Sequence, residues 1–197
     1  LHRKKSHQII ILVLISNHPY MKKISALLFL CFSLNAFTQT PYKVSMNGIG
    51  PFKIGMQGNE VEKLTATKLK FVNLLKEEWT FDTLSITYND LPCTLVFDKQ
   101  FGENDKQQLV LREVYSKSNL IATPSGITIG DDKLKIINTY TQYTVWIVPA
   151  YENDYKSRST TNTDIMVHGD ETGNIIISHL YMNKVTSISV TYNENYD

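Results

Sequence analysis

The residue types that could bind a metal ion lie close together near the C-terminus. His168 and His179 are the two histidines that follow residue 38, and two acidic residues lie between them. If residues 169–173 form a turn between two strands, His168 faces Asn174 and His179 faces Thr163, which separates the histidines by about 16 Å along the strands. One ion cannot join ligands that far apart, because each ligand lies about 2 Å from a bound zinc ion. We therefore expect two separate histidines on strands, with no bound metal and no cofactor.

Cys93 is the one candidate thiol nucleophile beyond residue 38, where it has no second cysteine for a disulfide. A catalytic cysteine needs a histidine within hydrogen-bond reach. Cys93 alternates with Leu95 and Phe97, however, which is typical of a strand that faces a hydrophobic core. No serine lies in a Gly-x-Ser-x-Gly context, and residues 55–58 lack the lysine of a phosphate-binding loop. The sequence favours a non-catalytic protein over an enzyme.

A group of aromatic and polar residues could bind another protein. Trp146, Tyr151 and Tyr155 flank a polar loop that continues through Arg158. Tryptophan, tyrosine and arginine often anchor protein interfaces, because they are large and stiff or can make paired hydrogen bonds. We take these four residues as the candidate binding residues. The alternative is that Trp146 lies in the core and that the tyrosines surround it at the surface.

Two similar stretches of sequence contain the elements that would position these residues. Residues 50–64 read GPFKIGMQGNEVEKL and residues 124–140 read PSGITIGDDKLKIINTY. In each, an Ile-Gly pair allows a sharp turn, and a polar residue follows that can cap a helix, Asn59 in the first and Asp131 with Asp132 in the second. Each stretch thus predicts a corner between a strand and a helix. The apolar residues with helical spacing are Val61, Leu64 and Phe71 in the first helix and Leu134, Ile137 and Tyr140 in the second.

After each predicted helix, the apolar spacing changes to the alternation of β-strands. The segments between the alternating runs are rich in Asn, Asp, Gly and Pro, which favour turns. The predicted strands span residues 84–88, 93–97 and 109–115 after the first helix, and residues 145–148, 165–168, 175–181 and 185–192 after the second.

The predicted fold class is α+β, with two tandem units that span residues 39–118 and 119–197. Each unit consists of one helix followed by an antiparallel meander of three or four strands. One helix covers only part of the hydrophobic face of such a sheet, so we expect the two units to bury their apolar faces together. The sequence leaves open whether they form one continuous sheet or two lobes.

The first 38 residues have the features of an export signal. Met21 is followed by two lysines, an apolar run and small residues before a plausible cleavage site at Gln39. We expect residues 21–38 to be a signal peptide and residues 1–20 to be an untranslated upstream extension. The predicted location is therefore periplasmic or secreted, without a transmembrane segment once the signal is removed.

The charge of the remaining chain argues against a nucleic-acid partner. Residues 39–197 carry 15 Lys and Arg against 19 Asp and Glu, which gives a net charge of −4. Proteins that bind nucleic acids have a basic surface that neutralises phosphates. We expect the partner to be another protein of the envelope or the extracellular space.

The stretch GPFKIGMQGNEVEKL resembles a motif of small α+β modules of the bacterial envelope. It is similar to the SmpA/OmlA-type assembly lipoproteins and, through its reappearance after 75 residues, to the β-lactamase inhibitor protein. The chain differs from the lipoproteins in lacking a lipobox and from the inhibitor in lacking disulfides. The resemblance implies an architecture and a tendency to bind proteins, with no catalytic residues to transfer.

Together these observations predict an exported, non-catalytic protein-interaction module. The alternative is a small-ligand-binding or hydrolytic protein with a pocket between the two units. That alternative requires convergent side chains, for example Cys93 within reach of His168 or His179.

Overall fold

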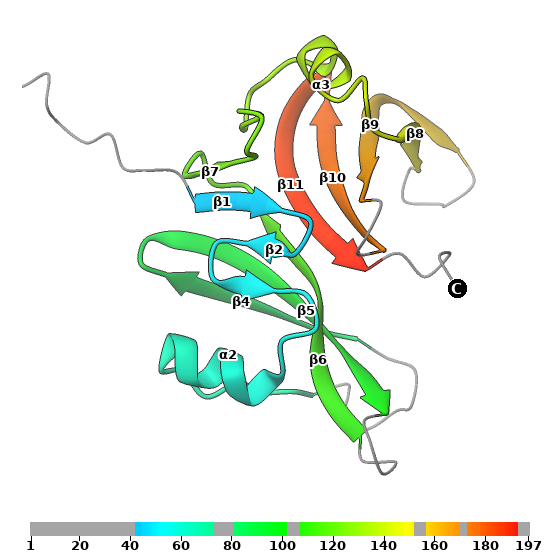
Figure 1. The fold of residues 1–197 in the computed structure, drawn as a ribbon. Coiled ribbons are helices and arrows are strands. Elements are labelled where there is room, and N and C mark those ends of the chain that lie inside the picture. Colours follow the sequence, from blue (N-terminus) through cyan, green and yellow to red (C-terminus); the bar gives the residue numbers. More distant parts are fainter. Residues whose placement is uncertain (1–41, 73–80, 102–106, 152–156, 170–172, 193–197) are drawn as a thin grey trace, which may run out of the picture. The chain divides into compact units, whose positions relative to one another are not determined.

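The computed structural model describes residues 42–72, 81–101, 107–151, 157–169 and 173–192 (Figure 1). The predicted upstream extension and signal peptide lie outside these residues. The described part of residues 40–197, which form a compact unit of their own, contains eleven strands and two helices. In chain order they are β1 (Tyr42–Ser45), β2 (Gly48–Ile49), β3 (Phe52–Lys53), α2 (Gly58–Thr65), β4 (Asp82–Tyr88), β5 (Leu91–Phe101), β6 (Gln107–Ser116), β7 (Ile121–Ala122), α3 (Lys133–Thr139), β8 (Val145–Tyr151), β9 (Arg158–His168), β10 (Asn174–Tyr181) and β11 (Lys184–Tyr192).

The strands form two sheets. The larger sheet has seven antiparallel strands in the order β4-β5-β6-β11-β10-β9-β8, and the smaller has four strands in the order β3-β2-β1-β7. In the smaller sheet β1 and β7 run parallel, whereas β1, β2 and β3 are antiparallel. Figure 1 shows the larger sheet continuing from the green strands β4–β6 to the red and orange strands β11 and β10.

The predicted α+β class with two helix-plus-meander units is wrong, because the described chain is mostly β-sheet. The expected first helix was too long: α2 ends at Thr65, and Ala66 adopts a left-handed conformation with φ 52°. The strands before the first corner are the short pair β2 and β3, which belong to the smaller sheet. The strands of the two predicted meanders belong to one sheet, because β6 pairs with β11 and so joins all seven strands.

Two tight hairpins fix the register of strands in the larger sheet. Asn89 and Asp90 connect β4 to β5 with φ 44° and 66°, and Met182 and Asn183 connect β10 to β11 with φ 48° and 63°. Positive φ at both central residues defines a type I′ turn, whose twist matches that of the flanking strands. Asn and Asp tolerate this conformation better than most residues. These turns were predicted in position, as were the strands that they join.

The first glycine corner docks against β6. Gly55 has φ 83°, and its amide donates to the carbonyl of Leu111 at 2.8 Å. The helix that follows is capped by Gln57, whose amide donates to the Glu60 carboxylate at 2.8 Å. The corner was therefore predicted correctly, but the cap was not: Asn59 lies inside the first turn of α2, one residue past its start.

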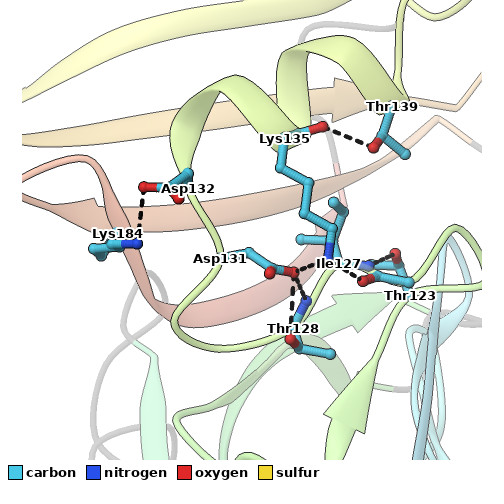
Figure 2. Close-up of polar contacts among 9 residues, drawn as sticks. Thr123, Ile127, Thr128, Asp131, Asp132, Lys135, Thr139 and Lys184 are labelled. Carbon is cyan, nitrogen blue, oxygen red and sulfur yellow. Dashed lines mark hydrogen bonds and ion pairs between the residues drawn. The ribbon is translucent and has the colours of Figure 1, made fainter.

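The second glycine corner docks against the β10–β11 hairpin (Figure 2). Gly130 has φ 92°, and its amide donates to the carbonyl of Val185 at 2.8 Å. Asp131 accepts hydrogen bonds from the Thr128 amide and from Lys135 Nζ, both at 2.8 Å. Asp132 is the N-cap residue by position, but its side chain makes no capping bond. Of the two polar residues predicted here, Asp131 stabilises the corner through its hydrogen bonds.

The buried face of α3 agrees with the predicted one at Ile137 and Tyr140, which pack in or against the core, but not at Leu134. Leu134 is 70% exposed, while Ile136 and Tyr140 are buried one turn apart. α3 spans only Lys133–Thr139, and the residue that it buries within this span is Ile136. Residues four apart share a helix face, which places Ile136 and Tyr140 together.

The hydrophobic core lies on one face of the larger sheet, which we call the covered face. The smaller sheet and α2 contact this part of the molecule through β6 and β11. Backbone alternation assigns buried residues of β5, β6, β11, β10 and β9 to this face. Members of the core cluster include Val44, Ile49, Phe52, Leu95, Val114, Ile136, Ile165, Ile176 and Ile188.

Neither α2 nor α3 has the length and hydropathy that crossing a bilayer requires, and the described residues contain no other helix. The prediction that no transmembrane segment follows the signal agrees with this finding as far as the described residues extend.

Candidate functional site: the open face of the larger sheet

The face of the larger sheet opposite the core, which we call the open face, carries one continuous row of side chains across all seven strands. Directly opposed residues on neighbouring strands share a face. The row changes from hydroxyl-bearing residues at β4 and β5 to apolar residues at β10, β9 and β8. Its members in order are Ser85, Thr94, Tyr115, Ser189, Ile177, Met166 and Trp146.

A histidine lies beside the middle of this row, with both ring nitrogens hydrogen-bonded. His179 Nδ1 lies 2.8 Å from Asp164 Oδ1, and Nε2 lies 3.1 Å from Ser189 Oγ. Because a carboxylate can only accept, Nδ1–H donates to Asp164, and the second hydrogen bond joins Nε2 to the Ser189 hydroxyl. The Tyr115 ring packs against the imidazole with its centroid 5.9 Å away. The imidazole is therefore held in one orientation by three neighbouring strands.

The order Asp–His–Ser is that of a hydrolase triad, but access rules out this chemistry. In a triad the serine oxygen attacks a substrate carbonyl, so the hydroxyl must be reachable. Ser189 is 0% exposed, although it lies on the open face between Tyr115 and Ile177 of the neighbouring strands. The arrangement thus orients His179 and satisfies the buried serine.

Cys93 cannot complete a catalytic pair with either histidine. It lies on the covered face of β5, opposite Ile86, whereas His179 lies on the open face of β10. Burial raises the pKa of the Cys93 thiol to about 12, although a hydrogen bond with Ser116 opposes this rise. The thiol therefore stays protonated at neutral pH. Cys93 is buried, so the prediction that it is a core residue is confirmed.

A shallow hollow of about 350 Å³ lies over β4, β5 and β6. Its walls include the hydroxyl side chains of Ser85, Thr87 and Thr94, together with Tyr115 and Lys117. The Lys117 ammonium lies 5.7 Å from the centre of the Tyr115 ring, within the range of a cation–π contact. The polar end of the open face is thus indented, and Tyr115, which lines the hollow, also packs against His179.

At the apolar end of the open face, Trp146 packs against His168. The ring centroids are 4.3 Å apart, and Trp146 is 49% exposed while His168 is only 3% exposed. No described residue lies within hydrogen-bond distance of His168 Nε2. One side of the Trp146 ring is therefore exposed to solvent, and the other side packs against the buried His168. The alternative prediction that Trp146 is a core residue is wrong.

Of the four predicted binding residues, the structure describes the side chains of Trp146 and Arg158. Tyr151 and Arg158 are paired across β8 and β9, and Arg158 is exposed. Trp146 lies five residues before Tyr151, about 16 Å along the strand at ~3.3 Å per residue. The side chain of Tyr151 and the whole of Tyr155 lie outside the described residues. Trp146 is thus the predicted residue that belongs to the row on the open face.

The register expected for β9 and β10 was wrong by one residue. The sequence therefore did not predict that Asp164 and His179 lie side by side. We expected His179 to face Thr163 and His168 to face Asn174, but His179 pairs with Asp164 and His168 with Ile175. A shift of one residue moves every side chain to the other face of the sheet. The alternation of Asn162, Asp164, Met166 and His168 was visible, but the register that brings Asp164 to His179 was not.

The fold and this site together define a β-sheet protein with a partly polar, partly aromatic open face. Comparisons with protein-family models, curated proteins and solved structures returned no match to this chain. Among the described residues no group of three or more His, Cys, Asp or Glu side chains could hold a metal ion.

Proposed function

We propose that this chain is a non-catalytic protein-interaction module and that its partner binds the apolar end of the open face. Trp146 is the anchor, and Met166 and Ile177 extend the contact along the same row. Tryptophan and methionine are enriched at protein interfaces relative to the rest of the surface. The partner is another protein of the envelope or the extracellular space, in keeping with the predicted export signal.

The observation that carries this proposal is the packing of Trp146 on His168. An interface residue binds more tightly when its side chain is already held in the bound conformation, because less side-chain entropy is lost. The Trp146 ring has a partner at 4.3 Å, yet half of its surface is accessible. It has the size, exposure and fixed orientation of an interface hot spot.

The polar neighbourhood of the row fits the same role. His179 presents a partly exposed ring whose two nitrogens are engaged within the sheet. A polar rim around an apolar centre is the usual anatomy of an interface between two proteins. Asp164 and His179 supply such a rim next to Met166 and Ile177.

The test is a comparison of partner recovery from an envelope extract between the wild-type protein and Trp146→Ala. Loss of a hot-spot tryptophan costs about 2 kcal/mol or more, or roughly a thirtyfold loss of affinity. Recovery of the bound protein should fall accordingly, while circular dichroism and the melting temperature stay close to those of the wild type.

Tyr143→Ala is the matched control. Tyr143 is an aromatic residue with the same exposure of 49%, but it packs against Tyr140 next to α3 and does not belong to the row on the open face. It should leave partner recovery unchanged. Equal recovery with Trp146→Ala and the wild type would remove the proposal, as would equal losses in the two variants.

A further inference from the structure

The two edges of the larger sheet are built differently. β8 forms one edge and carries Pro149, next to which its register with β9 shifts. Proline and irregular pairing are devices that prevent an edge strand from accepting another strand. β4 forms the other edge with seven regularly paired residues and contains neither proline nor lysine nor arginine. Within the described part of the chain, β4 is therefore a long edge without these protections.

The hairpin turn determines which backbone groups of β4 point outward. In a two-residue hairpin the residues that flank the turn are hydrogen-bonded to each other, so Tyr88 and Leu91 form such a pair. Hydrogen-bonded pairs alternate along an antiparallel ladder. The N–H and C=O groups of Thr83, Ser85 and Thr87 therefore point away from β5. No described residue forms a hydrogen bond with these outward groups.

The sequence of this edge is self-complementary. Residues 83–87 read Thr-Leu-Ser-Ile-Thr, which is symmetric in residue class about Ser85. If a second β4 pairs with it in the antiparallel direction around Ser85, threonine faces threonine on the open face and leucine faces isoleucine on the covered face. Threonine pairs and aliphatic pairs are both favourable across strands, and no like charges meet.

We infer that β4 is a dimerisation edge, at which two copies of this chain pair about a twofold axis through Ser85. A twofold interface uses the same surface of both subunits, which is what a self-complementary strand provides. Residues 83, 85 and 87 of the two copies would exchange about six backbone hydrogen bonds. The larger sheet then continues from one subunit into the other. This inference is independent of the proposed partner site, because Trp146 lies on the opposite edge strand.

The experiment measures the sedimentation of the full chain as a function of protein concentration. The wild type should pass from monomer to dimer as concentration rises. Ser85→Lys places two ammonium groups against each other on the axis, so its dimer should dissociate at a concentration at least about tenfold higher. Ser85 is exposed and makes no ladder bond to β5, so this variant should fold normally, which circular dichroism verifies.

A charge pair tests the position of the axis. Ser85→Glu should weaken the dimer for the same reason as Ser85→Lys, and an equimolar mixture of the two should form a heterodimer at concentrations at which each variant alone is monomeric, because opposite charges then face each other. Ser125→Lys, at an exposed serine in the turn before the second corner, should dimerise like the wild type. A wild type that is monomeric at every concentration overturns the inference, and so does a dimer that Ser85→Lys leaves intact or a mixture that stays monomeric.

Discussion

Replacing Asp131 with alanine should destabilise the protein more than the loss of its ion pair with Lys135 alone would. The Thr128 amide donates to the carboxylate at 2.8 Å, and such a bond to a charged acceptor contributes about 1.5 kcal/mol. The ion pair with the half-exposed Lys135 adds at most about 0.5 kcal/mol, because solvent screens it. Asp131→Ala should therefore lower the free energy of unfolding by about 2 kcal/mol near neutral pH.

The pH dependence follows from the pKa of Asp131. Burial by itself raises this pKa, but the hydrogen bonds from Lys135 and Thr128 outweigh burial and hold it below the ordinary value of 3.8. A carboxyl group with a lower pKa in the folded state stabilises the fold above its unfolded pKa, and this contribution is lost as the pH falls through the folded pKa. The difference between wild type and Asp131→Ala should thus be complete near neutral pH and shrink below about pH 4.

Urea denaturation at several pH values measures this difference, and Asp132→Ala is the control. Asp132 carries the same charge one residue later, but its partner Lys184 is exposed and its side chain caps nothing. Its loss should cost less than about 0.5 kcal/mol. If Asp132→Ala costs as much as Asp131→Ala, or if the Asp131→Ala difference does not change with pH, the bracing of the corner by Asp131 is refuted.

Three further predictions concern a buried thiol, two glycines and the loop after β8. Cys93 should react with iodoacetamide much more slowly in the folded protein than in urea, because burial raises the pKa of its thiol to about 12; equal rates would contradict its burial. Gly48→Ala should lower the melting temperature more than Gly55→Ala. Both glycines have positive φ, at a cost of about 1 kcal/mol for alanine, but only at Gly48 would the new methyl group overlap the Phe52 carbonyl oxygen; similar melting temperatures would argue against this clash. Replacing both Tyr151 and Tyr155 with alanine should leave partner recovery close to that of the wild type, because the proposed contact is centred on the row around Trp146; a large loss would contradict this position of the contact.

The sequence predicted local features well where one residue type determines the backbone. Gly55 and Gly130 mark the two corners, and the hairpin residues Asn89 and Asp90 mark a turn, because few residues tolerate positive φ. The alternation around Cys93 likewise predicted its burial. These signals depend on the nearest neighbours in the chain and need no knowledge of the rest of the fold.

Features that depend on distant parts of the chain could not be predicted. The pairing of β6 with β11 joins residues more than 70 positions apart, and nothing near Val114 or Val190 identifies the other as its partner. The register of β9 and β10 depends on a turn of uncertain length, and an error of one residue there concealed Asp164 as the partner of His179. Short strands such as β2 contain only two residues, too few for any alternation to be seen.

The pairing of β6 with β11 has a consequence for the order of folding. Four residue pairs form this ladder, from Glu113 with Thr191 to Ser116 with Ile188, whereas the other ladders of the larger sheet contain between six and eight. Each of those other ladders joins strands that follow one another in the chain, so their loops close at a small entropic cost. The hairpins should therefore form early, and the β6–β11 ladder should form last. Amide hydrogens that bridge β6 and β11 should report the final step that turns separate hairpins into one sheet.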